Sequence, residues 1–228
     1  MSIQLQWLGH NCWLLKTGSH QLLIDPFLDD SPVATLKAHD VSPDFILVSH
    51  AHFDHVADVV PIANRTHATV IGMVELCHVL ATKHGVKHTV GMNLGGSFQA
   101  PFGRVKLTIA HHSSSFADGT YAGPPVGFVL TIETRKLYFA CDTALFYDMR
   151  LIGAGGLDLA VVPIGDHYTM GPTDSIEAIK LLEPRRVLPT HYNTWPPIAQ
   201  DAGQWAERVR RHTKAEPIVL DVGQTIEV

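Results

Sequence analysis

The sequence has few cysteines and no cluster of basic residues. Cys12, Cys77 and Cys141 are an odd number at wide spacing, which fits neither a disulfide framework nor a Cys-x-x-Cys metal or redox motif. We therefore expect three buried thiols in a reducing compartment. The formal net charge is −5 at pH 7 and Lys and Arg form no run, so the chain lacks the positive stripe that attracts a phosphate backbone. Nucleic acid is not an expected partner.

Long apolar runs are also missing. No segment approaches the roughly 18 apolar residues that span a bilayer, and the start MSIQLQWLGHNCWLL lacks a basic segment and a small-residue cleavage site. We expect no membrane association and a cytoplasmic location. Hydrophobic residues make up 46% and charged residues 17% of the chain, which is typical of globular proteins. We expect residues 1–228 to form a single domain, with assembly into a homo-oligomer left open.

Fifteen histidines against five methionines are the unusual feature of the composition. The densest group is SHAHFDHVAD, residues 49–58, directly after the apolar run FILV. His50 and His52 are two residues apart at a predicted strand end, where the period of two directs both side chains to one side, so they can hold one ion. Asp54 and His55 follow at a predicted helix start and diverge by about 100°. Asp54 and His55 are therefore poorly placed to bind the same ion as His50 and His52, and we expect them to bind a second ion nearby.

Further candidate metal ligands stand where other apolar strands are predicted to end. IAHHSSS places His111 and His112 at such a position, YFACDT places Asp142 there, and LPTHYNTW places His191 there. A catalytic zinc needs about three protein ligands and a water, so distant segments of this kind are required to complete a site. Alternation along a strand allows only one of His111 and His112 to face it.

The pattern of apolar runs and of Gly and Pro predicts short strands and moderate helices. Strands are predicted at residues 3–8, 12–16, 21–25, 45–49, 69–71, 105–110, 126–133, 137–141, 159–163, 186–189 and 218–221. Helices are predicted at residues 54–64, 74–84, 175–183 and 199–212. Each half of the chain runs strands first and helices after, which indicates two sheets packed face to face with helices outside, a layered α/β arrangement.

The ordered set HAHFDH, a later histidine, an aspartate and a last histidine resembles the metallo-β-lactamase superfamily of binuclear hydrolases. WLGHNCWLL, IDPF, GMNLGGSF, HSSS, CDTALF, PIGDHYTMGP and THYNTWPP resemble its small branch of metal-dependent hydrolases, near the ascorbate-6-phosphate lactonases. The resemblance implies a four-layer αββα sandwich. It also implies a metal-binding residue set: His50, His52 and His112 for the first ion, Asp54, His55 and His191 for the second, and Asp142 as the bridge.

The same resemblance assigns Asp25 to orienting the ligand loops, a role that fits the partner a metal-bound imidazole needs. Where the family has a glycine before the bridging aspartate, this chain has Cys141, which is expected to point away from Asp142 as its strand neighbour. His10 and Asp166 are candidate substrate or proton-transfer groups, with a hydrogen-bonded structural role as the equal alternative.

Other polar and aromatic residues are interpreted as structural. His167 and Tyr192 are weaker site candidates, and Ser113 to Ser115 are expected to be turn and cap residues. The aromatic residues expected to be core rather than substrate platforms are Trp7, Trp13, Phe53, Phe116, Tyr168 and Trp195.

The predicted function is hydrolysis of a small ester, lactone or phosphoester. Two divalent ions can share a water and supply hydroxide at neutral pH, while Asp54 and Asp142 hold the geometry. A ligand set of His and Asp without thiolate suits zinc, and manganese, iron or nickel also accept it. Two alternatives remain: a phosphodiesterase of the nuclease type, which the acidic charge disfavours, and a non-catalytic protein that binds or senses metal.

Overall fold

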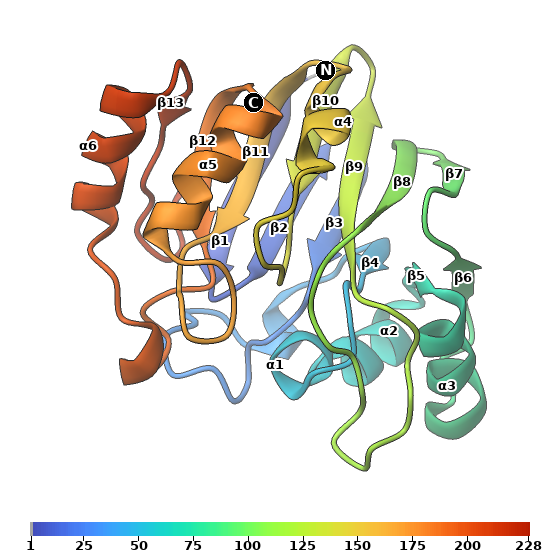
Figure 1. The fold of residues 1–228 in the computed structure, drawn as a ribbon. Helices are drawn as coiled ribbons and strands as arrows, with labels where there is room; N and C mark the ends of the chain where they lie inside the picture. Colours follow the sequence, from blue (N-terminus) through green and yellow to red (C-terminus); the bar gives the residue numbers. More distant parts are fainter. Residues whose placement is uncertain (1) are drawn as a thin grey trace.

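The structure is a computed structural model and describes residues 2–228. Two seven-stranded sheets pack face to face, with helices on their outer faces (Figure 1). The first sheet has the order β14-β1-β2-β3-β4-β5-β6. Its strands are β1 (Ile3–Gly9), β2 (Cys12–Thr17), β3 (His20–Ile24), β4 (Phe45–Leu47), β5 (Thr69–Met73), β6 (Thr89–Met92) and β14 (Thr225–Glu227). The predicted four-layer αββα arrangement is confirmed.

The second sheet repeats this plan with the order β13-β12-β11-β10-β9-β8-β7. Its strands are β7 (Ser97–Ala100), β8 (Gly103–Ile109), β9 (Val126–Ile132), β10 (Arg135–Phe139), β11 (Leu157–Pro163), β12 (Pro184–Thr190) and β13 (Glu216–Pro217). Each sheet combines an antiparallel part with a parallel part: β3 to β6 pair in parallel in the first sheet, as do β10 to β13 in the second.

The central parallel strands are apolar on both faces because one face meets the other sheet and the opposite face meets a helix. In β11 the stretch from Leu159 to Val162 is buried throughout, and in β4 Ile46 and Leu47 are fully buried. Buried residues of both sheets belong to one hydrophobic cluster, to which Trp13, Phe128 and Phe139 contribute large side chains. The core therefore lies between the two sheets.

Helices α2 (Val59–Thr66) and α3 (Val74–His84) pack on β5 and β6, while α5 (Pro172–Leu182) and α6 (Ala202–His212) pack on β11 and β13. Helix α4 (Met149–Gly153) packs against α5. Helix α5 begins with Pro172, which suits a first helical turn. Its buried residues Ile176, Ile179 and Leu182 lie on one face at the predicted helical spacing.

Some predicted elements differ from the structure. The helix predicted at 54–64 is two helices, α1 (Phe53–Val56) and α2. Between them the backbone N–H of Asp58 donates to the Pro26 carbonyl, outside the helix, and the Asp58 carboxylate accepts the backbone N–H groups of Leu28 and Asp29. The strand predicted at 218–221 is wrong: β13 ends before it and β14 begins after it. Strands β6 and β7 and helix α4 were not predicted, since each has five residues or fewer and little periodicity.

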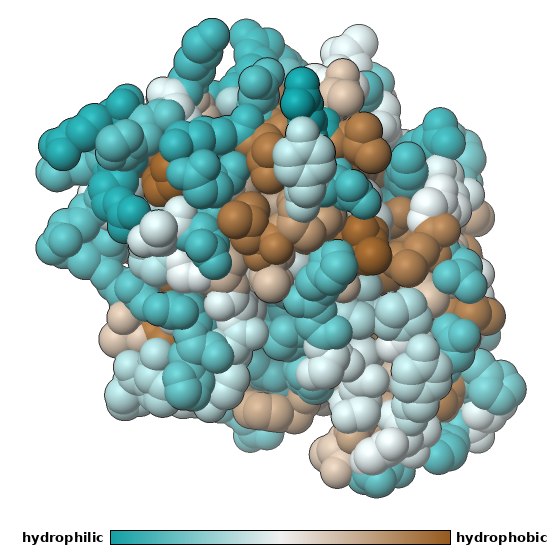
Figure 2. Space-filling view, viewed as in Figure 1, coloured by the Kyte–Doolittle hydropathy of each residue, from teal (hydrophilic) through white to brown (hydrophobic). Residues whose placement is uncertain are grey.

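The outer face of β8 and β9 carries apolar residues at the surface. Figure 2 shows apolar atoms gathered on the face where α4, β8 and β9 lie. Leu94, Ile109 and Leu151 are exposed there, and they line a hollow of about 610 Å³ together with Arg104 and Lys106. Within residues 2–228, no helix has the length and hydropathy required to cross a membrane. Cys12, Cys77 and Cys141 are free and buried, as predicted.

Candidate metal centre

The candidate site lies where strands of both sheets end at one edge. The pairings make β1, β3 and β4 run in one direction in the first sheet, and β8, β10 and β12 run in one direction in the second. The loops after these strands carry the predicted polar residues. They are His10, Asp25, His50, His112, Asp142 and His191. Their convergence follows from strand direction, because carboxyl ends of like-directed strands meet at the same edge.

The chain turns sharply after several of these strands. His10, Asp25, Cys141 and His191 have φ angles of 51°, 44°, 53° and 54°. This left-handed region costs a residue other than glycine about 1–2 kcal/mol. Strain of this kind gathers where a functional constellation must be held in place. The turns direct the side chains that follow each strand back over the sheet edge.

Three histidines form the first group of candidate ligands. His50 Nε2 lies 2.9 Å from His52 Nδ1, and His112 Nε2 lies 3.3 Å from the same nitrogen. These three residues could hold a metal ion. The neighbouring His111 is exposed, and its ring packs on Phe146 instead. The structure therefore brings His112, and not His111, to the group.

Asp54, His55 and His191 form the second group, and His10 joins them. The Asp54 Oδ2 atom lies 3.7 Å from His55 Nε2, 3.9 Å from His191 Nε2 and 2.9 Å from His10 Nε2. The four residues could together hold a metal ion.

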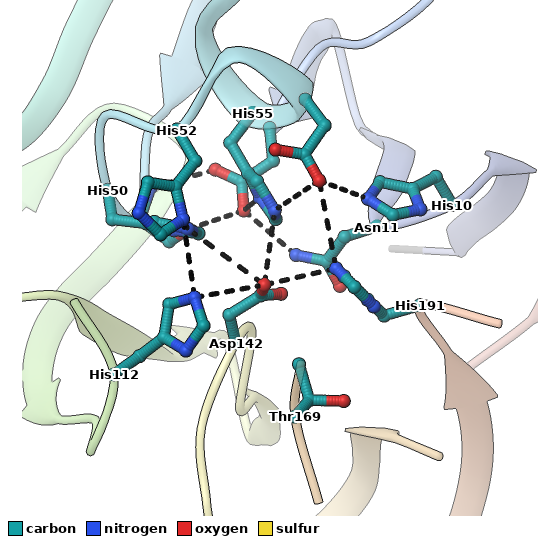
Figure 3. Close-up of polar contacts among 12 residues, drawn as sticks. His10, Asn11, His50, His52, His55, His112, Asp142, Thr169 and His191 are labelled. Carbon is teal, nitrogen blue, oxygen red and sulfur yellow. Dashed lines mark hydrogen bonds and ion pairs between the residues drawn. The ribbon is translucent and has the colours of Figure 1, made fainter. Parts of the chain in front are cut away.

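Asp142 stands between the two groups (Figure 3). Its Oδ2 atom lies 3.0 Å from His191 Nε2 and 3.4 Å from His55 Nε2 on one side. On the other side it lies 3.6 Å from His112 Nε2 and 3.9 Å from His50 Nε2. All seven residues that the family resemblance implies as ligands thus meet in one cluster.

The cluster fits divalent cations. Four ligand atoms about 2.0–2.1 Å from a tetrahedral zinc lie roughly 3.4 Å from one another, close to the separations around Asp142 Oδ2. His55 Nε2 and Asp142 Oδ1 are buried and have no hydrogen-bond partner within residues 2–228, although such atoms are normally satisfied. Imidazole nitrogens packed against carboxylate oxygens are also the donor types that zinc and related metals accept.

Asp25 orients two of these imidazoles from behind. It is fully buried, and its Oδ2 accepts hydrogen bonds from the Ser49 hydroxyl at 2.6 Å, Asn11 Nδ2 at 2.8 Å and His55 Nδ1 at 2.8 Å. Ser49 Oγ in turn lies 2.9 Å from His50 Nδ1. A proton on Nδ1 of each histidine leaves Nε2 with its lone pair toward the cluster, which is the tautomer a metal ligand needs.

The electrostatics suit a cation at this place. Burial opposes ionisation of Asp142, but His191 and His55 outweigh it and hold the pKa of Asp142 well below its usual value. Burial lowers the pKa of His50, so this imidazole stays neutral. Burial would also lower the pKa of His55, yet the carboxylates of Asp142, Asp54 and Asp25 raise it well above the usual value. The carboxylates therefore favour a positive charge at this place, whether it is a proton on His55 or a bound cation.

His10 and Asp166 do not lie where a pocket rim was expected. His10 is fully buried behind Asp54, and its Nδ1 contacts the Thr194 hydroxyl at 2.7 Å, so both ring nitrogens are occupied. Burial, followed by the neighbouring His191, lowers the pKa of His10 to about 3. Asp166 is exposed, lies outside the cluster and does not line the adjacent cavity. His167 beside it is exposed as well.

Cys141 does not alternate with Asp142 as a strand neighbour, because β10 ends at Phe139. Its φ of 53° lies in the region that glycine adopts freely, which is a physical reason for the glycine that the family resemblance implies at this position. The thiol is buried, and burial raises its pKa well above the usual value. Asp142 nevertheless reaches both groups, and Cys141 belongs to none of the candidate metal groups.

A cavity of about 640 Å³ opens over the cluster. Besides His52, Asp54, His112, Asp142 and His191, its lining residues are Phe53, Ser113, Ser115, Phe116, Ala117, Gly119, Tyr168 and Trp195. The prediction that these aromatics are core was wrong for Phe53 and Tyr168, whereas Phe116 and Trp195 are half-buried and Phe116 packs against the core. Phe53 is 57% and Tyr168 is 54% exposed, whereas Trp7 and Trp13 are buried as predicted. One signal was available: Phe53 lies between His52 and Asp54 in the sequence.

Comparisons with known proteins agree with this geometry. Residues 20–192 match the family of the β-lactamase superfamily domain. A UPF0173 metal-dependent hydrolase of Thermus thermophilus is 49% identical over 208 residues, covering 91% of this chain and 92% of its own. One from Pelotomaculum thermopropionicum is 43% identical over 231 residues, covering 99% of this chain and 100% of its own.

A solved structure is similar over the whole chain. Igni18, described as a novel metallo hydrolase from the hyperthermophilic archaeon Ignicoccus hospitalis, has a TM-score of 0.91 and 32% identity, and the match covers 100% of this chain and 99% of that one. These relatives share the fold and cover nearly the full length. The chain therefore belongs to the metallo-β-lactamase superfamily, within the UPF0173 group of metal-dependent hydrolases.

Proposed function

We propose that this protein is a binuclear metal-dependent hydrolase of a small ester, lactone or phosphoester. The observation that carries the proposal is the position of Asp142 Oδ2, within 4 Å of imidazole nitrogens from both groups of candidate ligands. In this proposal His50, His52 and His112 hold one cation, and Asp54, His55 and His191 hold the other. Zinc suits these donors best, with manganese, iron and nickel as alternatives.

Two bound divalent cations would supply hydroxide at neutral pH and polarise the scissile carbonyl or phosphoryl oxygen. The residues of the chain hold the metal-binding side chains in fixed orientations. Asp25 and Ser49 fix the rings of His55 and His50 so that one nitrogen of each faces the cluster. Asp142 occupies the space between the two groups.

His10 is a positioning residue in this proposal. Its ring joins the Asp54 carboxylate to the Thr194 hydroxyl, and it does not line the cavity in which substrate would lie. His10 therefore orients Asp54, and the proton for the leaving group comes from water in the cavity. Asp166 is exposed and outside the cavity lining, so we propose no chemical role for it. The hydrophobic cluster shared by both sheets supports one domain over residues 1–228.

The test combines metal analysis with a substrate panel. Elemental analysis of the purified wild-type protein is expected to find about two divalent ions per chain. Lactones, aryl esters, aryl phosphates and phosphodiesters are then assayed with wild type, His52→Ala, His112→Ala and His111→Ala. The last variant is the matched control, because His111 is adjacent to His112 in the sequence but outside the cluster. His52→Ala and His112→Ala are expected to lose metal and activity, and His111→Ala to keep both.

The other outcomes separate the alternatives. Two ions per chain without turnover of any compound would support a non-catalytic protein that binds or senses metal. Turnover confined to phosphodiesters would support the phosphodiesterase alternative. Equal loss in His111→Ala and His112→Ala, or fewer than one ion per chain after growth with added metal, would contradict the proposed centre.

A further inference from the structure

We propose that the substrate of this site is a neutral ester or lactone with a flat apolar group, preferably an aromatic ring, and that the site disfavours phosphate esters. This inference rests on the proposed hydrolase function and specifies its substrate class. Two features of the cavity support it: aromatic side chains on several sides, and no Arg or Lys in its lining.

The first aromatic wall is built by Phe27, Phe53 and Trp195. The ring centroids of Phe27 and Phe53 are 5.8 Å apart and edge to face, and Trp195 lies 5.9 Å from each of them. Phe27 is buried and supports the other two, whereas Phe53 is 57% exposed toward solvent. Such mutual packing holds the exposed ring in place, so a substrate ring meets a surface that is already ordered.

This wall begins directly beside the metal cluster. Phe53 is adjacent to both His52 and Asp54 in the chain, and the Trp195 ring lies 5.1 Å from the ring of His10, which contacts Asp54. A carbonyl group placed over Asp54 and Asp142 therefore leaves its substituent beside Phe53 and Trp195. The wall is positioned to bind the part of the substrate next to the bond that is cleaved.

The other sides of the cavity are also largely apolar. Phe116 is half-buried and stacks on His84, with centroids 5.7 Å apart and planes at 29°. Tyr168 is 54% exposed, and Ala117 and Gly119 add small surfaces. An aromatic ring bound between Phe116 and the first wall would exchange water contacts for apolar ones, at about 25 cal/mol for each Å² buried.

The charges of the lining distinguish acyl from phosphoryl substrates. Phosphate groups are usually held by the forked donors of Arg or by Lys, and none of the residues that line the cavity is Arg or Lys. The acidic lining residues are Asp54 and Asp142. Cations of the proposed centre would contact the reacting group in either class, so they do not discriminate. A neutral carbonyl compound needs no further counter-charge, whereas a phosphodiester would lack one.

The reaction proposed is ester hydrolysis. The oxygen of hydroxide bonds to the carbonyl carbon, the bond from this carbon to the ester oxygen breaks, and the released alkoxide takes a proton from water. The hydroxide left by that water takes the proton of the new carboxylic acid, so the products are a carboxylate and an alcohol, which in a lactone are the two ends of one hydroxy acid. No oxidant or other co-reactant is required.

The first test uses matched substrates with the metal-loaded wild-type protein. Isochroman-3-one and δ-valerolactone are six-membered lactones that release primary alkoxides, and only the first has a fused benzene ring. After division by each uncatalysed rate, kcat/KM is expected to be about tenfold higher for isochroman-3-one. Acetate and phosphate esters of 4-nitrophenol share a leaving group, and the acetate is expected to be turned over in strong preference to the monoester and the diester.

The second test uses variants of the wall. Phe53→Leu and Trp195→Leu are each expected to reduce the preference for isochroman-3-one several-fold, mainly through a higher KM, with metal content unchanged. Tyr147→Leu is the control, because Tyr147 is 69% exposed and does not line the cavity. The exposed Phe53 ring can be shortened without emptying the core, so this variant is expected to fold.

Three results would overturn this inference. They are equal treatment of the two lactones by wild type, a preference for the phosphate esters, and an unchanged lactone preference in both wall variants. In each case the metal content and the activity lost in His52→Ala would still support the hydrolase function. Failure of the hydrolase function itself is distinguishable, since no compound of either panel would then be turned over.

Discussion

Each imidazole held by Asp25 or Ser49 has one nitrogen facing the cluster and the other bonded to the protein. Asp25 receives hydrogen bonds from Asn11, Ser49 and His55, and it is fully buried. A carboxylate is needed because it accepts all of these bonds and carries no donor of its own. The direction of the His55 lone pair therefore depends on a residue that does not face the cavity.

We predict that Asp25→Asn lowers the affinity for metal by about 10-fold to 100-fold. The amide brings a donor against Asn11, Ser49 and His55, which are donors already, so the His55 ring loses its fixed orientation. Competition with a chromophoric chelator measures this affinity. Asp58→Asn is the control, since Asp58 is also buried but bonds the backbone of Leu28 and Asp29 instead. A similar loss of affinity in both variants would contradict the role of Asp25.

At the scale of elements, the site depends on how closely neighbouring strand ends approach. Gly165 follows β11, and a Cβ added to it would lie 2.1 Å from the backbone oxygen of His191, after β12. Gly153, at the end of α4, is equally crowded: a Cβ there would lie 2.2 Å from the backbone oxygen of Leu182 in α5. Only the first of these close contacts touches a candidate ligand.

We predict that Gly165→Ala and Gly153→Ala both destabilise the protein, by about 1–3 kcal/mol each, because the added methyl displaces packed backbone. Gly165→Ala also moves His191, so it is expected to reduce metal affinity and turnover, whereas Gly153→Ala reduces neither. Urea unfolding gives the stabilities, and chelator competition gives the affinities. If Gly153→Ala lost as much metal as Gly165→Ala, the effect would be general loosening of the fold and not a shift of His191.

At the scale of the whole molecule, the proposed centre joins the two sheets. His50, His52 and His55 come from the loop and helix α1 that follow β4, while His112, Asp142 and His191 come from loops after strands of the second sheet. A cation bound by both halves is absent from the unfolded chain, so its binding free energy adds to the stability of the fold.

We predict that removing the metal ions of both sites with a chelator lowers the thermal midpoint by about 10–20 °C. Free metal at 100 times its dissociation constant contributes about 2.7 kcal/mol per site, and a protein of this size shifts by about 2–4 °C per kcal/mol. Calorimetry with and without chelator measures the change. Asp142→Asn, which weakens both groups, is expected to show a much smaller chelator effect. If the chelator left the thermal midpoint of the wild-type protein unchanged, a metal centre that links the sheets would be contradicted.

Much of the fold was predictable because its signals are local. The apolar runs of β4 and β11, and the spacing of Ile176, Ile179 and Leu182 in α5, depend on neighbours a few residues away. The break between α1 and α2 was not predictable, because Asp58 bonds the loop at Leu28, which is 30 residues distant in the chain. Edge strands such as β7 and β13 are too short to leave a pattern.

The sequence by itself determined the layered fold and the strand ends at which the candidate ligands stand, because like-directed strand ends share an edge. The full set of seven residues, with His112 in place of His111, came from the family resemblance that the sequence motifs carry. Tertiary structure alone decided the rest. It buried His10 behind Asp54, left Asp166 outside, and placed Phe53, Phe116, Tyr168 and Trp195 around one cavity. These positions depend on packing between segments far apart in the chain, which the residues next to each side chain in the sequence do not determine.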